Sequence, residues 1–110
     1  MIHELHLDPA PFAAIAKREK TVEMRLFDEK RRRISPGDTL HLIERGTGKS
    51  LAARVVALHR FPTFCELYKA IPHLALGYPR GVTGDPADME AYYSEEEQKA
   101  FGVVGIEISL

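Results

Sequence analysis

The sequence predicts an α+β domain built on a small, closed or nearly closed β-barrel of short, mostly antiparallel strands, with helices covering the barrel openings. Strand-like segments begin and end the chain and recur three times between, whereas the helical segments are few and short. At 110 residues, the chain is expected to form a single domain over residues 1–110, large enough for one hydrophobic core. A split antiparallel α+β sheet is the alternative architecture.

The first third of the chain predicts a strand, a helix and a second strand. Ile2–Leu7 alternates between apolar and polar residues, which is typical of a half-buried strand. Asp8 is a suitable N-cap, and the proline and apolar spacing after it predict a helix over residues 9–18. Residues 21–27 form the next predicted strand. Residues 28–33 are charged and lack apolar periodicity, so we predict an exposed loop there.

The middle of the chain predicts a β-hairpin. Pro36-Gly37-Asp38 is a turn sequence, because proline presets φ and glycine tolerates a positive φ. Strands are expected over residues 39–44 and 51–58, with a glycine-containing turn between them.

The last third predicts helices followed by a closing strand. Thr63 begins a capping-box pattern and an apolar stripe. Residues 74–84 contain glycine and proline and are expected to be a loop. A short helix is predicted after Asp85, and Ser94 begins a second capping box whose helix ends at Gly102. The chain then alternates over residues 103–110.

Composition restricts the possible classes of function. The net charge of −1 combines a basic segment, residues 17–33, with an acidic one, residues 84–100. This mixture argues against strong, indiscriminate nucleic-acid binding. The only cysteine, Cys65, is expected to be a buried small hydrophobe in a reducing compartment. No signal-peptide pattern or membrane-length apolar run is evident, so we expect a cytoplasmic protein with no membrane partner.

The main candidate site lies around the second predicted strand. Alternation places Thr21, Glu23 and Arg25 on one face, with Lys20 in the preceding turn. Lys20 and Arg25 can bind phosphate or stabilise an oxyanion. Glu23 can accept a hydrogen bond from a base amino group, or act as a general base if burial raises its pKa. The structural alternative is a Glu23–Arg25 ion pair on a half-exposed strand.

Other candidate residues lie farther along the chain. His59 and Arg60 end the fourth predicted strand and can line the rim of a cleft, as ligand-binding residues or as plain surface. Tyr78, Tyr92 and Tyr93 can stack on bases or simply pack, and Lys30–Arg33 is a possible phosphate patch or a solvated loop. The histidines lack the close spacing of a zinc site, so no metal or cofactor is expected.

Several motifs occur in an order that resembles a known family. They are Lys20-Thr21-x-Glu23-x-Arg25, Ile34-x-x-Gly37-Asp38, Val55-Val56-Ala57-Leu58 running into Phe61-x-Thr63-Phe64, and Gly102-Val103-Val104-Gly105-Ile106-Glu107-Ile108. Together they resemble the ASCH domain of the PUA-like superfamily, over nearly the whole chain.

The resemblance implies a pseudo-barrel of five or six strands with a cleft beside the Lys20–Glu23–Arg25 strand. The family is widely proposed to bind RNA or nucleotides. Some similar proteins remove the acyl group from acetylcytidine, and others are described as ribonucleases. In the amidohydrolase branch a threonine proposed as the nucleophile occupies the position of Glu23, so this chain departs from that mechanism.

Three functions follow as expectations. The first is binding of RNA, a nucleotide or a modified nucleoside in a cleft lined by Lys20, Glu23 and Arg25. The second is hydrolysis of a nucleoside or RNA, with Lys20 as activator, Glu23 as general base and Arg25 as orienting group. The third is a non-catalytic adaptor whose acidic helices contact a protein partner.

Overall fold

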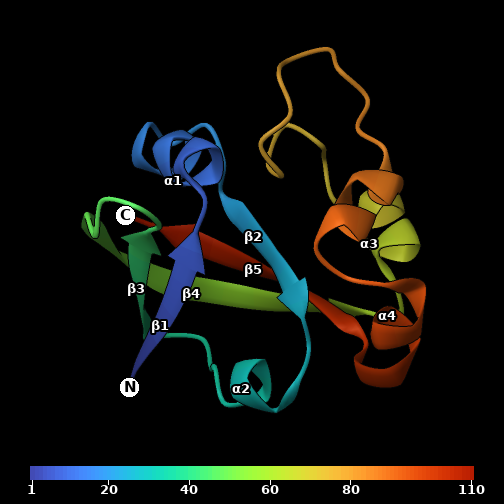
Figure 1. The fold of residues 1–110 in the computed structure, drawn as a ribbon, viewed down its shortest axis with the longest axis horizontal. Coiled ribbons are helices and arrows are strands. Elements are labelled where there is room, and N and C mark those ends of the chain that lie inside the picture. Colours follow the sequence, from blue (N-terminus) through green and yellow to red (C-terminus); the bar gives the residue numbers. More distant parts are fainter.

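The computed structural model describes all residues, 1–110, as a five-stranded half-barrel flanked by short helices (Figure 1). In chain order the elements are β1 (Ile2–Leu7), α1 (Pro9–Ala16), β2 (Val22–Leu26), α2 (Glu29–Arg32), β3 (Thr39–Glu44), β4 (Ser50–Phe61), α3 (Phe64–Ala70), the 3₁₀ helix η1 (Pro86–Ala91), α4 (Glu95–Phe101) and β5 (Val103–Ser109). The predicted α+β class is therefore confirmed. None of the helices has the length and hydrophobicity that crossing a bilayer requires.

The sheet has the strand order β1-β3-β4-β5-β2. Only the β1–β3 pair is parallel, and the predicted β3–β4 hairpin is present. The two terminal strands belong to the same sheet, as expected, but β3 and β4 lie between them. Strands β1 and β2 are the two edges, and in Figure 1 both lie in front of the crossing pair β4 and β5. The side of the barrel between β1 and β2 therefore has no backbone ladder.

Two hydrophobic cores lie on either side of β2. The larger one contains inward residues of the other strands and of α1, including Leu5, Leu40 and Ile106. The smaller one joins the outward face of β2 to α3 and η1, and Val22, Met24 and Leu26 all belong to it. Because side chains alternate along a strand, Glu23 and Arg25 point the other way, as the sequence predicts.

Two predicted boundaries in the first third were wrong. Helix α1 ends at Ala16, not at residue 18, because Arg18 takes the left-handed conformation with φ 63°. Residues 28–33 are not a plain loop, since they include α2. The Asp28 carboxylate accepts a hydrogen bond from the Arg31 backbone N–H at 3.1 Å, so a cap rather than an apolar stripe defines this short helix.

Three further expectations need correction. Strand β4 continues to Phe61, beyond the predicted end at residue 58, so His59 and Arg60 lie within the strand. Cys65 is exposed, because it points away from the buried stripe of α3. Thr63 bonds to the Glu66 side chain and does not cap a backbone N–H, whereas the predicted capping box of Ser94 is present.

Candidate functional site: a buried ion triplet beneath a tyrosine wall

Lys20, Glu23 and Arg25 form one connected ion triplet. Lys20 Nζ lies 2.9 Å from Glu23 Oε1. Arg25 donates from Nε at 3.0 Å and from Nη2 at 2.8 Å to Glu23 Oε2. The same Nη2 donates to the His6 carbonyl at 2.7 Å. Arg25 therefore joins β2 to β1 across the side of the half-barrel that has no ladder.

The triplet is nearly removed from solvent. The exposed fractions of the side chains are 10% for Lys20, 6% for Glu23 and 9% for Arg25. The predicted Glu23–Arg25 ion pair is therefore present, but the expectation that it lies half-exposed on the surface is wrong. Two cations and one anion leave a net charge of +1, which an electron-rich guest can stabilise. Ions this deeply buried are held at a desolvation penalty of several kcal/mol each.

Glu23 is held as a carboxylate. Burial by itself raises the pKa of the Glu23 carboxyl, but the neighbouring Lys20 ammonium and Arg25 guanidinium outweigh it, so that this pKa lies below its usual range. Burial likewise lowers the pKa of Arg25, and the Glu23 carboxylate more than restores it. A general base near neutral pH needs a raised carboxyl pKa. The geometry therefore does not favour the base role suggested for Glu23.

The triplet lines a hollow of about 310 Å³, at the lower end of the usual size of ligand pockets. We call this hollow the triplet pocket. Its walls come from the end of β1 and start of α1, from the loop after α3, and from η1 and the residues that follow it. The other lining residues are His6, Leu7, Asp8, Pro11, Met24, Arg45, Tyr68, Leu76, Gly77, Tyr78, Asp88, Met89, Tyr92 and Tyr93.

A chain of hydroxyl groups also lines the triplet pocket. The hydroxyl oxygens of Tyr68 and Tyr78 lie 2.8 Å apart, and Tyr78 donates to Asp88 Oδ2 at 2.7 Å. Because the single hydroxyl proton of Tyr78 points to Asp88, Tyr68 must be the donor to Tyr78. Burial, together with the bonds to Tyr68 and Asp88, raises the pKa of Tyr78 above its ordinary value. This part of the lining therefore consists of neutral tyrosines and one carboxylate.

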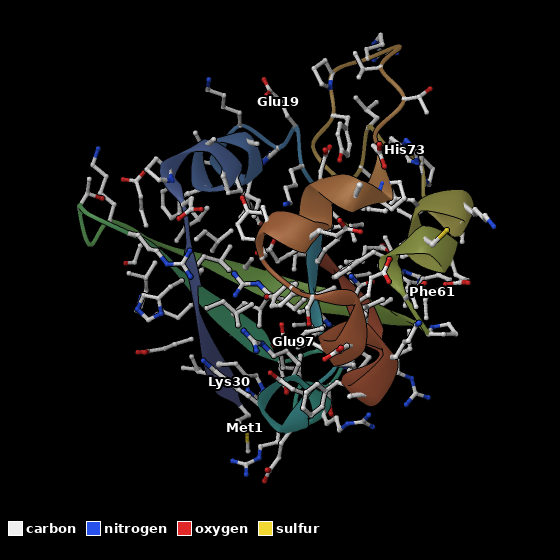
Figure 2. The ribbon with its side chains drawn as sticks, turned by 45° about the vertical axis from the view of Figure 1, so that its right-hand side comes forward. Met1, Glu19, Lys30, Phe61, His73 and Glu97 are labelled. Carbon is white, nitrogen blue, oxygen red and sulfur yellow. The ribbon has the colours of Figure 1, made fainter.

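The loop between α3 and η1 is held by His73 (Figure 2). In Figure 2, His73 lies where α3 runs into this loop. Its Nδ1 accepts from the Gly84 N–H at 2.8 Å, so Nε2 carries the proton and donates to the Tyr68 carbonyl at 2.7 Å. A Cβ on Gly77 would lie 3.2 Å from Lys20 Cδ, so the same loop also packs against the Lys20 stem.

We expect Gly84→Ala to disrupt the tyrosine wall. A Cβ at Gly84 would lie 2.4 Å from ring atoms of Tyr78, so the ring must move and lose its bonds to Tyr68 and Asp88. Overpacking of this kind costs about 1–3 kcal/mol of the free energy of unfolding. Urea denaturation measures it. In the double variant with Tyr78→Ala, the alanine at 84 should add almost nothing, and strictly additive effects would refute the packing argument.

The other predicted site residues lie elsewhere. Thr21 and His59 line a second hollow between the β4–β5 pair and the end of α3, where His59 Nε2 lies 3.0 Å from Glu107 Oε1. The guanidinium of Arg60 lies over the Phe27 ring. Thr21, His59 and Arg60 therefore do not join the triplet. Of the predicted ligand-binding set, the structure brings together Lys20, Glu23 and Arg25.

Sequence reasoning missed Tyr68 and Asp88 as site residues. Spacing alone places Tyr68 in the apolar stripe of its helix, and Asp88 only in the acidic segment. A tyrosine within an apolar stripe is a usable signal, because a buried hydroxyl requires a partner. No group of three or more His, Cys, Asp or Glu side chains is arranged to hold a metal ion.

Comparisons with known proteins agree with this architecture. The family model described as the ASCH domain matches residues 5–110. The crystal structure of hypothetical protein PH0355 is 33% identical, with a TM-score of 0.82, and the match covers 99% of this chain and 98% of that one. The solution NMR structure of protein PF0455 from Pyrococcus furiosus is 35% identical, with a TM-score of 0.73, and covers 99% and 96%. A search of curated proteins finds no significant match. The motifs, the half-barrel and these matches together show that the chain belongs to the ASCH domain family of the PUA-like superfamily.

Proposed function

We propose that the triplet pocket binds a single nucleobase, presented by a nucleoside, a nucleotide or a residue of RNA. The observation that carries this proposal is the position of the Lys20–Glu23–Arg25 triplet in a hollow faced by tyrosines and Asp88. Flat aromatic walls accept a base by stacking, and polar groups on two sides of a pocket distinguish its edges.

The two sides of the pocket have complementary hydrogen-bonding capacity. A lysine ammonium has three N–H donors, and Glu23 accepts from Lys20 Nζ. Arg25 uses Nε and Nη2 for Glu23 and the His6 carbonyl, and the Tyr93 side chain also interacts with its guanidinium. Donors therefore remain for a base carbonyl oxygen. Asp88, which also lines the pocket, receives one bond, on Oδ2, and Oδ1 is left for an exocyclic amino group.

The charge of the pocket favours a base over a phosphate. Its lining combines Lys20, Arg25 and Arg45 with Glu23, Asp8 and Asp88, so that the charges balance. Arg45 is already paired with Asp8 at 3.0 Å. A neutral guest with a carbonyl and an amino group, such as cytosine, fits this arrangement better than a dianion does. Both oxygens of Glu23 already accept bonds, so the amino-group acceptor suggested for Glu23 is better assigned to Asp88.

Binding is better supported than hydrolysis. Glu23 is ionised, paired through both oxygens and low in pKa, so it is a weak base for activating water. The pocket contains no serine, threonine or cysteine that would act as a nucleophile. Incubation with acetylcytidine, followed by chromatography, distinguishes the two functions, and the binding proposal expects no release of acetate.

Isothermal titration with cytidine and acetylcytidine tests the proposal. We expect binding that hardly changes with salt, because no phosphate is involved. Lys20→Met and Asp88→Ala should each weaken it by about tenfold to a hundredfold, since each removes a charged hydrogen bond worth about 1.5–3 kcal/mol. Lys69→Met, at an exposed position of α3, is the control and should leave affinity unchanged. The absence of binding across a full panel of nucleosides would refute the proposal.

A further inference from the structure

Two arginines share one aromatic ring outside the triplet pocket. The guanidinium carbon of Arg32, on α2, lies 4.4 Å from the centroid of Phe27, and that of Arg60, on β4, lies 5.3 Å from it. Arg32 Nη2 also donates to the Phe101 carbonyl at 3.1 Å. Both arginines are exposed although the ring beneath them is buried. We call Arg32 and Arg60 the arginine pair.

The arginine pair has no carboxylate partner, unlike its neighbours. Arg31 is paired with Asp28 at 2.6 Å, and Arg33 with Glu29 at 3.0 Å. No carboxylate lies within ion-pair distance of Arg32 or Arg60. The two guanidinium groups lie near the same ring, so their positive charges repel each other, and an anion that contacts both reduces this repulsion. Contact with the ring restrains both guanidinium groups, and apart from Arg32 Nη2 their N–H groups can donate to the oxygens of a phosphate.

Strand β2 connects the arginine pair to the triplet pocket. Arg25 lies on the pocket floor, and Phe27 follows directly after the end of the strand. Two residues of a strand span about 7 Å. Figure 1 shows β2 running toward α2, and Figure 2 shows Lys30 on that helix at the end of the molecule away from His73. The arginine pair therefore lies just beyond the end of the strand that carries the pocket residues Glu23 and Arg25, within reach of the phosphates of neighbouring nucleotides.

We infer that the arginine pair binds the phosphate backbone of single-stranded RNA whose one base occupies the triplet pocket. This inference rests on the proposed function and extends its ligand from a nucleoside to a short RNA strand. The pocket selects the base, and the pair adds affinity that does not depend on sequence. It also explains how a domain with a net charge of −1 engages RNA without a basic surface overall.

Fluorescence anisotropy with a labelled oligocytidylate of about eight nucleotides tests the inference, a length within the range that single-stranded binding folds occupy. We expect Arg60→Gln to weaken binding about three- to tenfold at physiological salt. The slope of log affinity against log salt should fall by about 0.7 for each phosphate that the protein no longer neutralises. Arg32→Gln should act similarly, and the double variant should combine both effects. Cytidine affinity, measured by titration, should stay unchanged in every variant.

Arg54→Gln is the matched control, because Arg54 lies on the same strand, is exposed and has no ion pair. Arg60 makes only the ring contact, so its variant remains informative if the Arg32 variant fails to fold. Equal decreases in affinity for Arg60→Gln and Arg54→Gln would overturn the inference, as would an unchanged salt slope. Equally tight binding of a sulfated polysaccharide, with the same dependence on the pair, would also overturn it. If Arg60→Gln binds both cytidine and RNA as tightly as the wild type does, this inference alone is overturned. If the wild type does not bind cytidine, the proposed function is overturned.

Discussion

Replacement of Glu23 by alanine is expected to lower the free energy of unfolding by about 3–5 kcal/mol. The change leaves the Lys20 ammonium and the Arg25 guanidinium buried beside each other without their shared anion. Removing one partner from a buried ion pair has costs of this size, because the remaining charge is uncompensated. Small domains are stable by about 5–15 kcal/mol, so the variant will be marginal. Urea denaturation followed by circular dichroism measures the loss.

Glu107→Ala is the control for this prediction. Glu107 lies on the neighbouring strand β5 and is also paired, with His59 at 3.0 Å, but its side chain is 41% exposed. Exposed pairs contribute about 0–1 kcal/mol. If the two alanine variants lose the same stability, burial does not set the strength of the triplet. Glu23→Gln keeps the size of the side chain, so its free energy of unfolding should lie between those of Glu23→Ala and the wild type.

The acid dependence of stability provides an independent test of Glu23. The pKa of Glu23 is lowered in the folded protein, so the unfolded chain binds the proton more readily. The stabilisation by the carboxylate is therefore present above the unfolded-state pKa, near the ordinary value of 4.5, and is lost as pH falls through the lowered folded-state pKa. The pKa values of Asp38 and Glu66 are lowered as well, so the difference between wild type and Glu23→Gln isolates the contribution of Glu23. The difference in the free energy of unfolding between the wild type and Glu23→Gln should be constant around neutral pH and become smaller in acid.

Replacement of Arg25 by methionine is the second large effect, with an expected loss of about 3 kcal/mol of unfolding free energy. The side chain makes two bonds to Glu23 and one to the His6 carbonyl, across the side where β1 and β2 share no ladder. Methionine fills similar space but leaves Glu23 Oε2 without its partner. Hydrogen exchange should also show faster opening of the two edge strands than of β4 and β5.

Arg25→Lys separates charge from geometry. A lysine keeps the cation but has one nitrogen, which cannot reproduce the planar fork that reaches both Glu23 and His6. Arg25→Lys is expected to lose less unfolding free energy than Arg25→Met, and its edge strands should still exchange faster than β4 and β5.

Arg45→Met, which removes an exposed pair with Asp8 on the rim of the same pocket, should change stability by less than about 1 kcal/mol. A loss in Arg45→Met equal to that in Arg25→Met would contradict the bridging role.

Local rules predicted much of the fold and the grouping of Glu23 and Arg25 in the candidate site. The alternation around Glu23 and Arg25 placed both on one face, because side-chain direction in a strand follows from sequence alone. The same rules could not predict that this face is buried, since burial depends on how far the sheet curls. They also missed α2, where a single cap from Asp28 replaces apolar periodicity.

The rest of the site depends on long-range packing. Tyr78 and Asp88 reach the pocket because His73 and Gly84 fix the loop between α3 and η1. No local pattern encodes where such a loop closes. His59 and Arg60 are neighbours in sequence, yet strand alternation sends one to the second hollow and the other to Phe27. A residue that is close in sequence to a cleft residue therefore need not line the cleft itself.

A crystal structure of the protein soaked with cytidine tests base binding in the triplet pocket most directly. We expect the base to lie in the pocket between the triplet and the tyrosines. Its carbonyl oxygen should lie within hydrogen-bond distance of Lys20 Nζ or the Arg25 guanidinium, and its amino group should lie near Asp88. An ordered cytidine in the second hollow beside His59, or an empty triplet pocket at saturating cytidine, would contradict this mode of binding.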